Sequence, residues 1–255
     1  MPNQQPTARH LTWDACYNVR DLGGLPTVDG GQTRWQAVIR TDLLNRLTEQ
    51  GRRALLDYGV RTVIDLRGLK EVADEPSPFT LTTGATEQLT YLNLPLEKYD
   101  PHVSALISKA ANRAEVYCIT LDHYPDAMAE VMRAIGHARP GGVVIHCHAG
   151  KDRTGIIAAL LLSLAGVSAA AIAADYAESQ IRLWPLYEKL VAAAGGEDKV
   201  GFWLKPTATA EMMHIMLAHL DAKYGGVRNY LTAAGLSSTE LEQLQQLLRD
   251  DAHGK

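Results

Sequence analysis

Short apolar runs alternate with longer amphipathic stretches along the first 150 residues of the chain. Four of the runs are rich in β-branched and apolar residues and are bounded by Gly, Pro or charged positions, which is typical of strands. These predicted strands are residues 37–40 (AVIR), 62–66 (TVIDL), 91–96 (YLNLPL) and 143–147 (VVIHC). The stretches between them have helical spacing. The pattern therefore predicts an α/β fold in which helices flank a central mixed sheet.

The predicted helices divide into two groups. Before the last strand they cover residues 48–58, with Thr48 as N-cap, 103–118 and 125–138; after it they cover residues 154–165, 168–179, 185–194, 207–224 and 237–249. Gly and Pro punctuate the second group, and residues 195–206 are expected to form a flexible loop. We expect a loose tail at residues 1–12 and a single domain at 13–255. That domain has a helical insertion at about residues 101–140 and C-terminal helices at 168–255.

Composition and charge exclude several classes of function. The 25 Lys and Arg residues are outnumbered by 29 Asp and Glu, so the chain lacks the broad cationic field that holds nucleic acids. Its most hydrophobic run, residues 156–165, is far shorter than the roughly 20 apolar residues that span a bilayer. No stable membrane insertion is therefore expected. Three widely spaced cysteines do not suggest a disulfide framework. These features favour a cytoplasmic location, with export by a route without a cleaved signal left open.

The chemistry concentrates in residues 141–155, GGVVIHCHAGKDRTG, where a strand leads through a tight loop into an apolar helix. Loop N–H groups above a helix N-terminus form a site for anions. Cys147 stands at the loop entrance, and Arg153 returns beside it to bind two phosphate oxygens with its guanidinium. The same surroundings favour the thiolate form of Cys147. The hydroxyl of Thr154 is expected to hydrogen-bond that thiolate, and Gly150 to let the backbone approach the ligand.

The segment HCHAGKDRTG resembles the HCxxGxxR[ST] loop of the protein tyrosine phosphatase superfamily. Further stretches resemble a bacterial tyrosine and dual-specificity phosphatase subfamily with mycobacterial members. They are NVRDLGG at 18–24, RWQAVIRTDLL at 34–44, GVRTVIDLR at 59–67 and KYGGVRNYLTAAGLS at 223–237. The resemblance implies a phosphatase fold and hydrolysis of phosphomonoesters through a phosphocysteine, with release of inorganic phosphate. No metal or cofactor is implied.

The resemblance also implies substrates and residue roles. Phosphorylated proteins are the expected substrates, and phosphoinositides are associated in the family with a lysine at the position of Lys151. The loop residues His148, Ala149, Gly150 and Lys151 are expected to bind the phosphate. No Trp-Pro-Asp sequence, the usual setting of the general acid in the superfamily, precedes Cys147. Asp152 in the loop matches the subfamily pattern and is the first candidate, and Asp100, whose place resembles that of the acid in dual-specificity phosphatases, is the alternative. Arg20 and Asp21 are expected to brace the floor of the site.

Two rival functions remain open on the sequence. A module that binds phosphate without catalysis would use the same loop, although such a module could lack Cys147, Arg153 or Thr154. An enzyme of sulfur transfer or arsenate reduction also uses a thiolate in an anion loop, but no second cysteine lies near Cys147 in the sequence. The triplet HCH is a poor zinc site because neighbouring strand residues face opposite sides.

Overall fold

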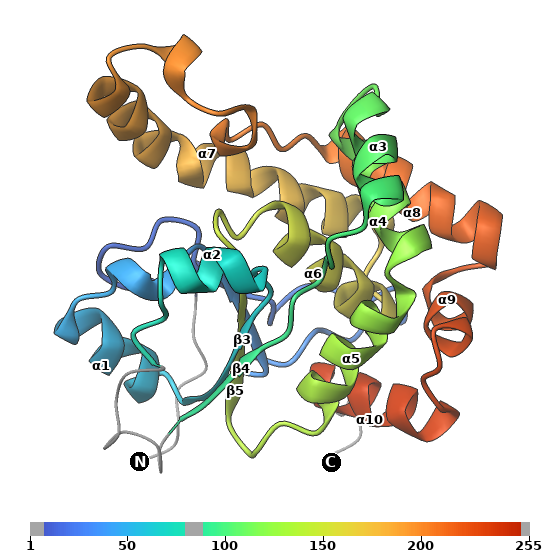
Figure 1. The fold of residues 1–255 in the computed structure, drawn as a ribbon. Coiled ribbons are helices and arrows are strands. Elements are labelled where there is room, and N and C mark those ends of the chain that lie inside the picture. The colour runs from blue at the N-terminus through green and yellow to red at the C-terminus, as the bar shows by residue number, and fades with distance from the viewer. Residues whose placement is uncertain (1–7, 80–88, 251–255) are drawn as a thin grey trace.

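The computed structural model describes residues 8–79 and 89–250. In these residues the expected mixed sheet is present, with five strands in the order β1-β2-β5-β3-β4 (Figure 1). The strands are β1 (Arg20–Asp21), β2 (Val38–Thr41), β3 (Val60–Asp65), β4 (Thr90–Asn93) and β5 (Gly142–His146). The predicted α/β fold is confirmed. The two-residue strand β1 was too short to leave a pattern in the sequence.

The central strand, β5, lies parallel to both of its neighbours. His146 at its end is in register with Thr41 of β2 and with Asp65 of β3. The carboxyl ends of the three strands therefore meet at one edge of the sheet. In open α/β sheets such an edge is where ligands bind, and Cys147 follows directly after β5.

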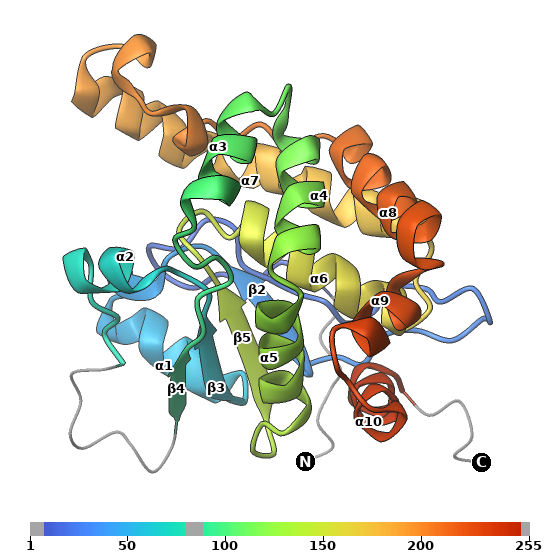
Figure 2. The ribbon, with the colours of Figure 1, turned by 45° about the vertical axis from the view of Figure 1, so that its right-hand side comes forward.

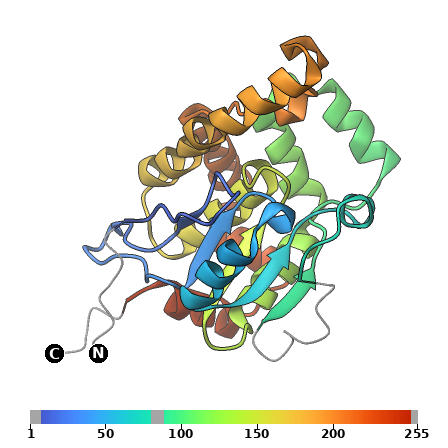
Figure 3. The same cartoon turned by 90° about the vertical axis from the view of Figure 1, so that its left-hand side faces the viewer.

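Helices cover both faces of the sheet. The α-helices of the described residues are α1 (Glu49–Asp57), α2 (Leu69–Asp74), α3 (Pro101–Lys109), α4 (Arg113–His123), α5 (Pro125–Gly136), α6 (Asp152–Leu164), α7 (Ala169–Ala194), α8 (Ala210–Tyr224), α9 (Val227–Ala233) and α10 (Ser238–Leu248). Helices α5 and α6 lie on one face (Figure 2), and α1 lies on the other (Figure 3). Thr48 caps α1 as predicted, since its hydroxyl accepts a hydrogen bond from the backbone N–H of Gly51 at 3.2 Å.

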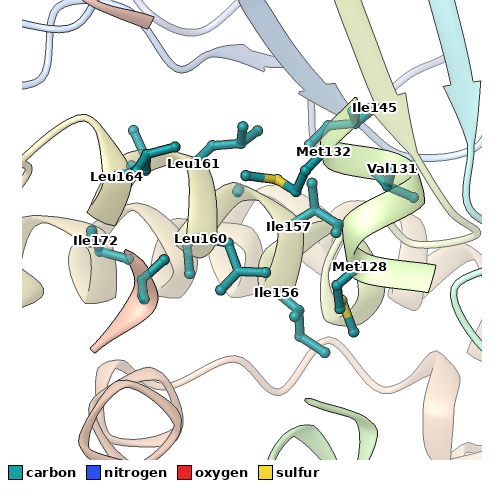
Figure 4. Close-up of a cluster of buried hydrophobic side chains, with 14 of the residues drawn as sticks. Met128, Val131, Met132, Ile145, Ile156, Ile157, Leu160, Leu161, Leu164 and Ile172 are labelled. Carbon is teal, nitrogen blue, oxygen red and sulfur yellow. The ribbon is translucent and has the colours of Figure 1, made fainter. Parts of the chain in front are cut away.

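Helix α6 is the centre of the larger hydrophobic core. Its apolar side chains are buried almost all round the helix, as expected for an element with protein on every side. Figure 4 shows Ile157 and Leu161 of α6 beside Ile145 of β5 and Met132 of α5, and Ile172 of α7 near the far end. The strand and the helix that flank residues 147–151 are thus packed into the same core, which fixes the two ends of this loop.

The predicted helix at residues 103–118 is wrong, because the chain forms two helices there, α3 and α4. Asn112 begins α4, and its side chain accepts a hydrogen bond from the backbone N–H of Glu115 at 3.1 Å. The carboxylate of Glu115 in turn accepts the N–H of Ala111 at 2.7 Å. These two hydrogen bonds satisfy N–H groups at a new helix start. A local capping pattern, N-x-x-E, therefore outweighs the continuous apolar spacing.

The prediction of separate helices at residues 168–179 and 185–194 is also wrong, because α7 continues through Pro185. A proline inside a helix cannot donate to the carbonyl four residues earlier, which belongs here to Ile181. Ile181 is 76% exposed, so this part of the helix faces solvent. Leu183 and Tyr187 are both buried. A continuous helix keeps both of them in contact with the core, and this packing overrides the stop signal.

Two segments of the domain prediction lie partly outside the described residues, namely the tail at 1–12 and the last residues of the C-terminal helices. Within the described part, Arg9 donates a hydrogen bond to the carbonyl of Asp21 at 3.1 Å, and His10 forms a β-bridge with Arg20. The chain is thus attached to the domain from residue 9 onward. Among the described residues, no helix has the length and apolar character needed to cross a membrane.

Candidate active site

A cavity of about 460 Å³ opens above the carboxyl end of β5. Cys147 lies in its wall and is 2% exposed, so its thiol is reached only from this cavity. The polar lining residues are Glu71, Glu97, Tyr117, His148, Asp152 and Arg153, and the apolar ones are Ile107, Val116, Ala149, Ile156, Trp203 and Leu204. The predicted nucleophile and the predicted phosphate-binding arginine therefore share one cavity with Asp152.

Three successive carbonyl groups of the loop are hydrogen-bonded on the side away from the cavity. The bonds run from the N–H of Leu43 to His148 O at 2.9 Å, from Asn18 Nδ2 to Ala149 O at 3.1 Å and Gly150 O at 3.0 Å, and from Arg40 Nη2 to Gly150 O at 2.9 Å. Across a planar trans peptide, the C=O of one residue points opposite to the N–H of the next. The N–H groups of residues 149–151 are therefore turned toward the cavity, where they can bind an anion.

Gly150 lies in the left-handed region, with φ at 62°. A Cβ on this residue would lie 2.1 Å from the carbonyl oxygen of Thr41 at the end of β2. The sequence analysis attributed this glycine to close approach of a ligand. The structure corrects that reason, because the close neighbour is the backbone of β2, and only glycine fits both the conformation and the space.

Arg153 enters the cavity from the first turn of α6 and is held there by Glu71 of α2. Two hydrogen bonds join the groups, from Nη1 to Oε2 at 2.5 Å and from Nη2 to Oε1 at 2.8 Å. Burial by itself would lower the pKa of Arg153, but these bonds and the nearby charges of Cys147 and Glu71 outweigh it and raise the pKa. The guanidinium is thus fixed, fully charged and adjacent to the thiol.

Asp152 lines the cavity with a side chain that is 21% exposed. Its Oδ1 accepts a hydrogen bond from the Tyr117 hydroxyl at 2.5 Å and lies 3.7 Å from Nη1 of Arg113. Burial raises the pKa of Asp152, and this effect outweighs the Tyr117 hydrogen bond and the charges of Arg113 and Arg153, which act in the opposite direction. A carboxyl group with a raised pKa beside the thiol is suited to proton transfer.

Lys151 does not lie where the sequence analysis expected it. Its side chain is fully buried, and its ammonium contacts Asp152 Oδ1 at 3.2 Å and the carbonyl of Thr207 at 3.3 Å. It is not part of the cavity lining. The cation expected beside the substrate therefore connects the loop to the segment between α7 and α8 instead.

Asp100 and Thr154 also differ from expectation. Asp100 is exposed and caps α3, accepting hydrogen bonds from the N–H groups of His102 at 2.8 Å and Val103 at 3.2 Å. It does not line the cavity, so a capping role explains it. The hydroxyl of Thr154 is buried and has no hydrogen-bond partner in the described part of the chain. The predicted bond from Thr154 to Cys147 is therefore absent.

The two histidines that flank Cys147 point to different sides. His148 lines the cavity, and its Nε2 lies 3.5 Å from Glu75 Oε2. His146 is fully buried behind the loop, where Nδ1 lies 3.0 Å from the carbonyl oxygen of Cys147. Burial lowers the pKa of both imidazoles. His146 therefore contacts the backbone of the loop and does not line the cavity.

A buried charge network connects the loop to α7. Asp175 of α7 forms ion pairs with Arg20 at 3.0 Å and Arg40 at 2.7 Å, and also with Arg9. Burial would raise the pKa of Asp175, but the three arginines outweigh it and hold the pKa well below its usual range. Since Arg40 also donates to Gly150 O, this network fixes the loop carbonyls. Arg20 braces the site as predicted.

Several cavity residues were missed by the sequence analysis. Glu71 and Glu97 follow predicted strands, but a lone glutamate in a connection gives no signal of its own. Trp203 belongs to the segment expected to be a flexible loop, where its aromatic neighbours in GFWL were the available hint. The guanidinium of Arg113 lies 4.7 Å from the Phe202 ring and 5.1 Å from the Trp203 ring. These contacts hold the segment as one wall of the cavity.

Comparison with known proteins gives a consistent result. A model of the tyrosine phosphatase family matches residues 11–250. A tyrosine-protein phosphatase from Nostoc commune is 35% identical over 221 residues, which cover 82% of this chain and 73% of that protein. A putative tyrosine-protein phosphatase from Cupriavidus necator is 28% identical, with coverage of 89% and 84%. The triple specificity protein phosphatase PtpB of Mycobacterium tuberculosis is 26% identical, with coverage of 91% and 96%.

Proposed function

The chain belongs to the tyrosine phosphatase family, and from this premise we propose that it hydrolyses phosphomonoesters through a phosphocysteine formed on Cys147. One observation carries the proposal. The thiol of Cys147 and the fixed guanidinium of Arg153 line the same cavity, over a loop whose N–H groups are turned inward. This arrangement offers a nucleophile and a cradle for three phosphate oxygens.

The reaction has two steps. The sulfur of Cys147 attacks phosphorus in line with the ester oxygen, while Arg153 and the loop N–H groups hold the equatorial oxygens. A carboxyl group of the cavity lining protonates the leaving oxygen. Asp152, the first choice of the sequence analysis, is one of three such carboxyls. Water then attacks the phosphocysteine, which releases inorganic phosphate and restores the thiolate of Cys147.

The cavity favours an aryl phosphate. Opposite the loop, its wall is built from Ile107, Val116, Trp203 and Leu204, and such a wall suits an aromatic ring. Phosphotyrosine is therefore the preferred substrate in this proposal. The relative named as a triple specificity phosphatase supports acceptance of further substrate classes, such as phosphoserine or phosphothreonine. Phosphoinositide hydrolysis has less support from the geometry, because Lys151 lies behind the lining.

The test compares wild type with Cys147→Ser and, as a matched control, Cys118→Ser. With p-nitrophenyl phosphate in the presence of a metal chelator, Cys147→Ser should lose on the order of 10⁴- to 10⁶-fold in kcat, the scale seen when a nucleophile is removed. Cys118→Ser should keep the wild-type rate. Rapid acid quench with labelled substrate should trap the label on the wild-type enzyme alone. Equal turnover by Cys147→Ser would overturn the proposal, and phosphate binding without turnover would indicate a binding module.

A further inference from the structure

Three carboxyl groups line the catalytic cavity, and they differ in how they are supported. Glu71 forms two hydrogen bonds with the guanidinium of Arg153. Asp152 is held by the Tyr117 hydroxyl and by Lys151. Both carboxylates thus accept hydrogen bonds that favour the ionised form, although burial still raises the pKa of Asp152. Glu97 forms no ion pair with any described residue.

The surroundings of Glu97 oppose its charge. Glu97 lies after β4, partly buried, and it accepts one long hydrogen bond, from Thr120 Oγ1 of α4 at 3.4 Å. The charged groups that face it are Arg153 and Asp152 of α6 and Glu71 of α2. The hydroxyl of Tyr124, the residue that joins α4 to α5, also interacts with it electrostatically. Burial is the largest influence and raises the pKa of Glu97. The two carboxylates add to this effect, and together they outweigh Arg153 and Thr120.

A proton donor must carry its proton before the reaction begins and must release it inside the cavity. Glu97 meets both conditions, since it lines the cavity that contains Cys147 and has little support as an anion. Asp100, the alternative named from the sequence, lies only three residues further but outside the lining. From this connection, Glu97 and not Asp100 therefore lines the cavity that contains the thiol.

We propose that Glu97 is a catalytic residue that protonates the leaving oxygen and then activates the hydrolytic water. This assignment rests on the phosphatase reaction proposed above. In the first step the S–P bond forms and the P–O ester bond breaks, and the carboxyl proton of Glu97 passes to the leaving oxygen. In the second step, the Glu97 carboxylate takes a proton from the water that attacks phosphorus. The S–P bond breaks, phosphate leaves, and Glu97 is protonated again.

The experiment measures how strongly Glu97→Gln depends on the leaving group. A general acid contributes most when the leaving oxygen is basic, as it is in phenyl phosphate. In Glu97→Gln, kcat/KM for phenyl phosphate should therefore fall at least about 100-fold. The kcat/KM for p-nitrophenyl phosphate should fall far less, because its leaving group departs without protonation. The alkaline limb of the pH profile for phenyl phosphate should also disappear. Asp152→Asn is the matched control, because it removes the carboxyl group that Tyr117 and Lys151 hold in the same cavity, and it should lower kcat/KM for both substrates by similar factors.

A second readout covers the water-activation step. With p-nitrophenyl phosphate, Glu97→Gln should release a burst of nitrophenol equal to the enzyme concentration, because breakdown of the phosphocysteine becomes limiting. Glu97→Asp, which keeps an acid, should recover part of the phenyl phosphate activity. If Glu97→Gln does not fold, Glu97→Asp still tests the assignment. An equal fall in kcat/KM for phenyl phosphate and p-nitrophenyl phosphate in Glu97→Asp would contradict the role of Glu97.

The outcomes separate the two proposals. If the wild-type enzyme has no turnover that depends on Cys147, the proposed function itself fails. If wild type turns over but Glu97→Gln lowers both substrates equally, or neither, the phosphatase stands and the role of Glu97 is overturned. The same conclusion follows if the selective loss appears in Asp152→Asn instead. Inhibition of each variant by inorganic phosphate shows that the cavity is still formed.

Discussion

The loop between β5 and α6 has two faces that are built in opposite ways. On its back face, away from the cavity, the carbonyls of three successive residues are hydrogen-bonded by Leu43, Asn18 and Arg40, and Arg40 is held in turn by buried Asp175. On its cavity face, the thiol of Cys147 and the inward N–H groups lie free of such bonds in the described structure. Hydrogen bonds to the carbonyls of the back face therefore orient the N–H groups of the cavity face toward a ligand.

The largest expected effect comes from the back face. Asp175→Asn leaves two buried arginines without their shared counter-charge, which should lower the free energy of unfolding by about 3–5 kcal/mol. Urea unfolding at pH 7 measures this loss. Glu178→Gln on the same helix is the matched control, because its ion pair with Arg182 is about one-third exposed and contributes at most about 1 kcal/mol. Equal stability of the two variants would contradict a stabilising role for the network.

The pH dependence of stability tests the same network. The pKa of Asp175 is held below its usual value in the folded state, so its contribution is present above the unfolded pKa of about 4. It is lost as the pH falls further toward the folded value. Wild type should therefore lose stability below about pH 4 more steeply than Asp175→Asn, as measured by thermal unfolding in matched buffers.

An intermediate effect is expected on the cavity face from Glu71→Gln. The neutral amide cannot fix both terminal nitrogens of Arg153, so kcat should fall by about 10- to 100-fold through loss of orientation. Inorganic phosphate should inhibit this variant more strongly, because a negative charge has been removed beside its site. Steady-state kinetics with phosphate as inhibitor measure both quantities. Glu49→Gln, at an exposed position of α1, is the control and should change neither quantity, and an unchanged kcat in Glu71→Gln would contradict the orientation argument.

The smallest effect is expected from Lys151, whose ammonium group lies outside the cavity lining. Lys151→Met removes a buried ammonium that contacts Asp152 and Thr207 O, so rates should fall by about threefold to tenfold. Since the ammonium is outside the lining, the factor should be the same for phosphotyrosine, phosphothreonine and phosphoinositide substrates. Lys70→Met, at an exposed position of α2, is the control. A selective loss of phosphoinositide activity would restore the direct contact that the sequence analysis expected.

The sequence allowed the cavity face to be predicted better than its surroundings. Cys147 and Arg153 follow from a short local pattern, because strand, loop and helix adjoin in the chain. Glu71, Glu97 and Trp203 reach the cavity from three separate connections, and only tertiary packing brings them together. The orientation of Lys151 depended on a neighbour 56 residues away. At Asn112 a local capping signal outweighed the apolar spacing, and at Pro185 the packing of α7 outweighed a local stop signal.

The side chain of Arg113 gives the cavity a further property. Its guanidinium packs against Phe202 and Trp203 and donates to the carbonyl of Phe202, while the same group approaches Asp152. The aromatic wall and the acidic group of the loop are therefore thermodynamically linked. A ligand that displaces the wall must change the proton affinity of Asp152, and protonation of Asp152 must change the cost of displacing the wall by the same amount.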